Sequence, residues 1–89
     1  MNAKMLLVPV LLAAPLAMAD PQCTTAAKDK WLSQSEARQK IEAMGYQIKK
    51  FETTDTSCYE IYGWDKEKHR VEIYFDPTNL KMVKEEVDE

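Results

Sequence analysis

Hydrophobic and polar residues follow a helical period in one stretch of the chain, and this stretch predicts an amphipathic helix over residues 34–44. Ser33-Gln34-Ser35-Glu36 has the form of a capping box at its start. Gly45 follows its end and is the residue type that best takes the left-handed conformation there. The apolar stripe of this helix consists of Ala37, Ile41 and Met44.

After Gly45 the pattern alternates with a period of two, which predicts antiparallel strands over residues 46–51, 58–64 and 69–76. Residues 82–87 are expected to add a short last strand or to fray. The inward positions of these strands are Tyr46, Ile48, Tyr59, Ile61, Val71, Ile73 and Phe75. The outward positions are Glu60, Tyr62, Trp64, Arg70, Glu72 and Tyr74.

Polar turns separate the predicted strands, and their order defines the fold class. Residues 53–57 and 65–68 form polar turns, and Pro77-Thr78-Asn79 forms another, in which asparagine can take a left-handed conformation. The sequence therefore predicts an α+β domain in which one main helix packs on a three- to four-stranded antiparallel β-meander.

The first 19 residues have the organisation of a cleavable signal peptide. Lys4 precedes an apolar run of about a dozen residues, and Ala17-Met18-Ala19 supplies small residues before the cleavage site. A membrane anchor is disfavoured because prolines interrupt the run and roughly 20 apolar residues are needed to span a bilayer. We expect a domain of residues 20–89 in a bacterial periplasm or outside the cell, without a membrane anchor.

Cys23 and Cys58 are the only cysteines, and export places them where disulfides persist. A bridge between them is expected to stabilise a domain whose core is too small to be secure alone. Cys58 has the parity of the outward residues of its strand. Either the N-terminal segment crosses to the outward face, or a bulge near Cys58 resets the alternation.

Charge and side-chain chemistry exclude several classes of function. The chain carries 12 basic and 15 acidic residues, interleaved along its length, which disfavours nucleic-acid binding. Its one histidine, His69, is interpreted as an exposed polar residue, and neither a catalytic site nor a metal site nor a cofactor is predicted. Acidic residues could bind calcium only weakly, because no loop has the spacing of an EF-hand. The acids considered are Asp65, Glu67 and Asp76.

The order and spacing of several motifs resemble the PepSY family, in its small exported single-domain form. The matching runs are Ser35-Glu36-Ala37, Met44-Gly45-Tyr46, Cys58-Tyr59-Glu60-Ile61-Tyr62 and Val71-Glu72-Ile73-Tyr74-Phe75-Asp76-Pro77, with Cys23 before the helix. Where family members often have Thr-Gly after Asp-Pro, this chain has Asn79-Leu80. The resemblance implies a non-enzymatic module that restrains peptidases or binds partners in the cell envelope.

Two hypotheses of function follow. The first is a binding or inhibitory module that meets a protein partner, such as a peptidase, through the outward face of the sheet, because Tyr, Trp and Arg are enriched at protein contacts. The second is a small-ligand or metal-ion binding envelope protein. The residues predicted for a partner surface are Glu60, Tyr62, Trp64, Arg70, Glu72 and Tyr74.

Overall fold

The computed structural model describes residues 20–88, and the expected signal peptide lies outside them. A short 3₁₀-helix, Lys28–Lys30, precedes the helix α1, Gln34–Ala43. Four strands follow: β1 Gln47–Thr53, β2 Tyr59–Trp64, β3 Arg70–Phe75 and β4 Met82–Asp88. They pair antiparallel in the order β1-β2-β3-β4, so the predicted helix and meander are confirmed and the last strand is present.

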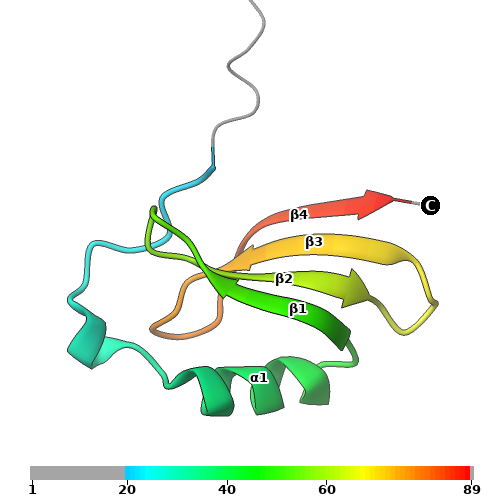
Figure 1. Ribbon diagram of the computed structural model, residues 1–89, viewed down its shortest axis with the longest axis horizontal. Coiled ribbons are helices and arrows are strands. Elements are labelled where there is room, and N and C mark those ends of the chain that lie inside the picture. The colour runs from blue at the N-terminus through cyan, green and yellow to red at the C-terminus, as the bar shows by residue number, and fades with distance from the viewer. Residues whose placement is uncertain (1–19, 89) are drawn as a thin grey trace, which may run out of the picture.

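Helix α1 lies against one face of the sheet, which we call the inner face, and the opposite side is the outer face (Figure 1). The Ser33 hydroxyl accepts a hydrogen bond from the backbone N–H of Glu36 at 3.1 Å, as the capping motif predicts. Gly45 ends the helix with φ of 108°, also as predicted. Met44 does not join the apolar stripe, because it lies beyond the last helical residue and is exposed.

The core lies between α1 and the inner face of β2 and β3. Trp31, Leu32, Tyr46, Ile48 and Phe51 pack around its margin. The buried residues of this core are Ala37, Ile41, Tyr59, Ile61, Val71, Ile73, Phe75 and Leu80. The predicted inward positions of β2 and β3 are therefore correct.

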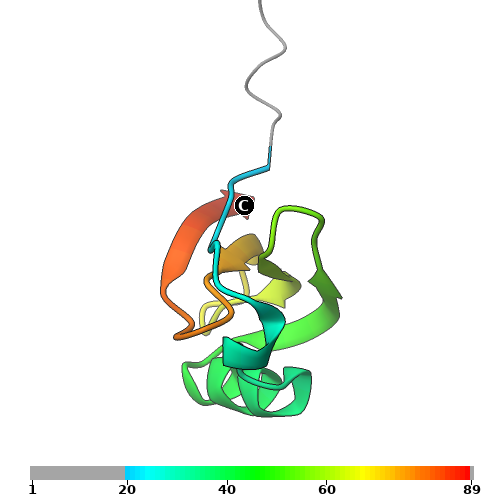
Figure 2. The ribbon, with the colours of Figure 1, turned by 90° about the vertical axis from the view of Figure 1, so that its left-hand side faces the viewer.

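The N-terminal segment, residues 20–31, runs past the end of the sheet to the start of α1 (Figures 1 and 2). A disulfide joins Cys23 to Cys58, with 5.0 Å between their Cα atoms, as predicted. Register shifts occur within β1 and between β3 and β4, whereas β2 pairs regularly with β3. The segment therefore reaches the outward parity of Cys58 by crossing to the outer face, without a bulge near this cysteine.

One turn differs from the prediction. The left-handed residue between β3 and β4 is Leu80, with φ of 62°, and not Asn79. The Asn79 side chain instead accepts a hydrogen bond from the backbone N–H of Lys81 at 2.8 Å. Asp76 holds the start of the same turn by accepting from the N–H and hydroxyl of Thr78.

Candidate functional site on the outer face of the sheet

Strand pairing brings the six predicted partner-surface residues together on the outer face. Residues of β2 stand directly opposite residues of β3, because the two strands pair without a register shift. The three cross-strand pairs are Glu60 with Tyr74, Tyr62 with Glu72, and Trp64 with Arg70. Alternation along the two strands was enough to find this set.

The six residues differ in their access to solvent. Tyr62 is 37% exposed and Arg70 is exposed, while Trp64 and Glu72 are half-buried. Glu60 and Tyr74 are only 4% and 5% exposed, so these two do not belong to the exposed part of the predicted surface. Part of the cover is the N-terminal segment, since the Tyr74 hydroxyl lies 3.1 Å from a carboxylate oxygen of Asp20.

Glu60 and Glu72 form a carboxyl pair at the centre of this face. Burial, together with the neighbouring Glu72, raises the pKa of Glu60 to about 7. The pKa of Glu72 is lowered, first by its contact with Glu60. Glu60 therefore holds the proton and Glu72 the negative charge at mildly acidic pH. Glu60 Oε2 is buried and has no hydrogen-bond partner among residues 20–88.

Two tyrosines border the carboxyl pair and stay protonated. Contact with Glu60 raises the pKa of Tyr62, and burial raises the pKa of Tyr74. Both rings also attract cations of the same chain. Lys50 Nζ lies 5.9 Å from the centre of the Tyr62 ring, and Lys84 Nζ lies 5.8 Å from that of Tyr74.

Tyr62 borders three shallow hollows of the outer face. One of about 280 Å³ extends toward Lys50, Trp64 and Arg70. A second, of about 440 Å³, extends between Arg70 and the end of β4. The third, of about 410 Å³, contains the carboxyl pair, and we call it the acidic pocket. Tyr62 is therefore the exposed centre of a surface that is hollowed on several sides.

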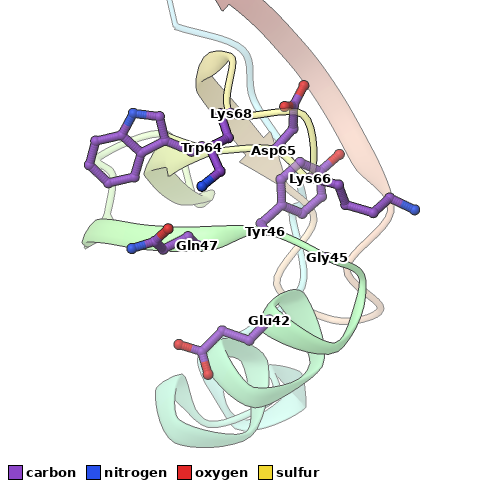
Figure 3. A pocket seen from close by; sticks show the side chains of 8 residues that line it. All are labelled: Glu42, Gly45, Tyr46, Gln47, Trp64, Asp65, Lys66 and Lys68. Carbon is purple, nitrogen blue, oxygen red and sulfur yellow. The ribbon is translucent and has the colours of Figure 1, made fainter.

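A fourth hollow, of about 510 Å³, meets the outer face at Trp64 (Figure 3). The end of α1, the start of β1 and the turn between β2 and β3 form it, and Tyr46 stands at its centre (Figure 3). Burial and the charges of Glu85 and Asp65 raise the pKa of Tyr46. Sequence reasoning did not find this hollow, because its walls come from segments that are distant along the chain.

The turn between β2 and β3 gathers Asp65, Glu67 and His69, whose ligand atoms lie within 4.8 Å of one another. His69 is thus half-buried against Asp65, at 3.1 Å, and not simply exposed. The Asp65 carboxylate also accepts the backbone N–H groups of Glu67 and His69 at 2.9 Å, and these bonds lower its pKa. The cluster closes the turn, and Asp76 does not belong to it.

Comparison with known families agrees with this architecture. The family model of the peptidase propeptide and YPEB domain matches residues 3–86. The chain belongs to this PepSY family. PepSY domains are generally non-catalytic modules of propeptide or inhibitor type that interact with peptidases. They are typically extracellular or periplasmic, and the disulfide of this PepSY domain fits an oxidising compartment.

No curated protein and no solved structure matches this PepSY domain. Within residues 20–88, none of the helices has the length and apolar character needed to cross a membrane.

Proposed function

We propose that this PepSY domain is an exported binding module that restrains or regulates a peptidase by contact through its outer face. The observation that carries the proposal is the exposed Tyr62, flanked by Trp64 and Arg70 and surrounded by hollows. Family membership supports a peptidase as the class of partner. Such residue types dominate protein contacts when a hollow surface lets a partner enclose them.

Export is part of this proposal. We propose that residues 1–19 direct the chain out of a bacterial cytoplasm and are removed before Asp20. Mass spectrometry of the protein purified after expression of the full chain should give the mass of a chain whose first residue is Asp20. A mass that retains Met1 in the purified envelope fraction would contradict the proposed processing.

The contact is tested by site-specific photo-crosslinking in the cells that make the protein. A photoreactive residue at position 62 should capture a peptidase, because this position is the exposed centre of the outer face. The same photoreactive residue placed at position 40, where Lys40 is exposed on α1, should not capture the peptidase. Equal capture from both positions, or capture of no peptidase, would contradict the proposal.

Inhibition is then measured with the captured peptidase and purified protein. The wild-type chain should lower peptidase activity, and the double variant Tyr62→Ala, Arg70→Ala should do so at least tenfold less well. Arg38→Ala is the matched control, because Arg38 is an exposed arginine of the helix. Tyr74 is unsuitable for this test, since its buried side chain supports the fold.

One observation favours the second candidate function, metal-ion binding, and it is the convergence of Asp65, Glu67 and His69. A bound ion would raise the melting temperature, because it binds the native state alone. Thermal denaturation with added Zn²⁺ and Ca²⁺ therefore measures this function. An increase that His69→Ala abolishes would establish it, and an unchanged melting temperature would exclude it at the concentrations used.

A further inference from the structure

The acidic pocket is a specific feature of the outer face, assembled from all four strands and the N-terminal segment. It holds five carboxyl groups and one lysine in a volume of about 410 Å³. Its lining consists of Asp20, Glu52, Glu60, Tyr62, Glu72, Tyr74, Lys84 and Glu86. This volume lies in the range of roughly 300–1,000 Å³ that is usual for ligand sites.

The pocket keeps net negative charge although the chain supplies some positive charge to it, namely Lys84 and the terminal ammonium group that the proposed cleavage leaves on Asp20. Glu52 pairs with Lys50 at 2.8 Å, and Glu86 pairs with Lys84 at 3.4 Å. Within the described part of the chain, the other three acids have no lysine or arginine at ion-pair distance. These three are Asp20, Glu60 and Glu72. The pocket therefore retains negative charge and attracts a cation from outside.

A buried oxygen without a partner marks the same pocket. Glu60 is 4% exposed, and its Oε2 accepts and donates no hydrogen bond within residues 20–88. Native proteins rarely leave a buried polar atom unpaired, because the lost hydration is not replaced. The atom is closed off from solvent, so a donor that enters the pocket supplies the missing bond once the side chains around Glu60 move aside.

We propose that the acidic pocket receives an arginine side chain of the protein partner. This inference rests on the proposed function and names the chemistry by which the partner is recognised. A guanidinium group carries five N–H donors in a planar fork, which suits carboxyl groups spread around a pocket. The Tyr62 ring at the rim offers an exposed aromatic face, and Lys50 already lies near that face.

The arrangement suits a guanidinium better than a metal ion. A metal ion requires its ligand atoms to converge on one point. Among the described residues, the group of three or more ligands that meets this condition is Asp65, Glu67 and His69, and none of them lines the acidic pocket. The carboxyl groups of the pocket are too dispersed for one ion, but they can each meet a different N–H group.

Binding of arginine is coupled to the release of a proton from Glu60. A guanidinium beside Glu60 favours its ionised form, so this carboxyl group releases its proton to solvent when the side chain enters. Affinity must then fall as the pH decreases below about 7, the pKa of Glu60 in the free protein. The groups that face Glu60 from the surrounding elements are Asp20, Glu52, Tyr62, Glu72, Tyr74, Lys84 and Glu86.

An NMR titration of the purified protein with N-acetyl-arginine amide tests the inference. At pH 8 the probe should shift the resonances of Tyr62 and Glu72 in a saturable manner, with a roughly millimolar dissociation constant. At pH 5.5 the affinity should be at least tenfold lower. N-acetyl-citrulline amide has the same shape without the charge and should cause no saturable shift.

Two variants identify the site. Glu60→Gln retains the shape of the carboxyl group and should weaken arginine binding at least tenfold at pH 8. Glu85→Gln is the matched control, because Glu85 lies on β4 opposite Ile73 and so faces the inner side of the sheet. Equal binding of citrulline amide, or unchanged arginine binding by Glu60→Gln, would overturn the inference.

The outcomes separate this inference from the proposed function. If peptidase inhibition depends on Tyr62 but arginine amide does not bind, the arginine subsite is wrong and the outer-face contact stands. If arginine amide binds through Glu60 but no peptidase is captured or inhibited, the subsite stands and its partner is a protein of another class.

Discussion

Leu80 occupies a backbone conformation that leucine rarely adopts. Its φ is 62°, while its side chain is only 6% exposed and belongs to the core. A left-handed residue other than glycine costs about 1–2 kcal/mol, whereas burial of a leucine side chain contributes about 1.5–3 kcal/mol. The chain therefore keeps at this turn a residue whose burial outweighs its backbone strain.

We predict an unusual order of stability for substitutions at Leu80. Leu80→Ala should lower the free energy of unfolding by about 2–4 kcal/mol, because it removes the buried side chain and retains the strain. Leu80→Gly should be about 1 kcal/mol more stable than Leu80→Ala, since glycine tolerates positive φ. Urea denaturation measures the order. At Ile73, in a regular strand, the glycine variant should be less stable than the alanine variant. If the order of the two variants were the same at Leu80 and Ile73, backbone strain at Leu80 would not explain it.

Glu60 should make stability depend on pH. Its pKa in the folded protein, about 7, is above the ordinary value of 4.5, so its contribution is complete below pH 4.5 and is lost as the pH rises through 7. The pKa of Glu72 is lowered, so its contribution is present above 4.5 and is lost as the pH falls. Of these two carboxyl groups, Glu60 therefore accounts for the change in stability between these values.

We predict that the free energy of unfolding decreases by about 2–3 kcal/mol between pH 4.5 and pH 7.5. Glu60→Gln should remove most of this decrease, because its side chain does not titrate. Urea denaturation at several pH values measures both proteins. Glu42→Gln, on the exposed surface of α1, is the control and should behave as wild type. An unchanged slope in Glu60→Gln would show that another group titrates.

At the scale of elements, β1 and β2 approach each other at Gly63. A Cβ atom at this position would overlap the carbonyl oxygen of Gln47, which is backbone and cannot move aside alone. We predict that Gly63→Ala lowers the free energy of unfolding by about 1–3 kcal/mol, because β1 must shift along the sheet edge. Hydrogen exchange should show lost protection in β1, with protection retained between β2 and β3. Equal loss of protection in all strands, or no loss in β1, would contradict this local mechanism.

Features that depend on neighbours in sequence could be predicted. The cap at Ser33 joins groups three residues apart, and the alternation of β2 and β3 is a property of each strand. The register shift in β1 could not be predicted in this way. It lets Ile48 and Phe51 both pack against the core although they are three positions apart.

The same distinction explains the candidate site. Alternation placed six residues on the outer face, but the contact that helps to cover Tyr74 comes from Asp20, which is many residues away. The acidic pocket depends equally on Glu52 of β1 and Lys84 of β4, which become neighbours only when the sheet forms. Contacts between distant segments carry no periodic signal.

At the scale of the whole molecule, the N-terminal segment connects the two faces of the sheet. Asp20 meets Tyr74 on the outer face, while Trp31 packs edge-on against Tyr59 on the inner face, with 5.6 Å between the ring centres. Between these contacts, Cys23 is bonded to Cys58. The disulfide therefore holds the segment between its contacts on the two faces, including the contact of Asp20 at the acidic pocket.

We predict two effects of the double variant Cys23→Ser, Cys58→Ser. Its free energy of unfolding should be about 2–4 kcal/mol lower, because the unfolded chain gains the freedom of a loop with a sequence separation of 35. Its pH dependence between 4.5 and 7.5 should also be smaller. Asp20 and Glu60 line the same pocket, so we expect that loss of the segment lets more water reach Glu60 and returns its pKa toward 4.5.

The two effects distinguish two roles of the disulfide. It either restricts only the unfolded chain, or it also holds the N-terminal segment over the acidic pocket of the folded protein. If the disulfide acts only on the unfolded chain, its loss lowers stability equally at every pH. The slope of the free energy of unfolding against pH then remains that of wild type. If the N-terminal segment leaves the pocket when the disulfide is lost, stability falls more at acid pH, where Glu60 contributes most. Urea denaturation of the double variant beside Glu60→Gln resolves them. An unchanged slope would mean that Asp20 and Trp31 hold the segment without the disulfide.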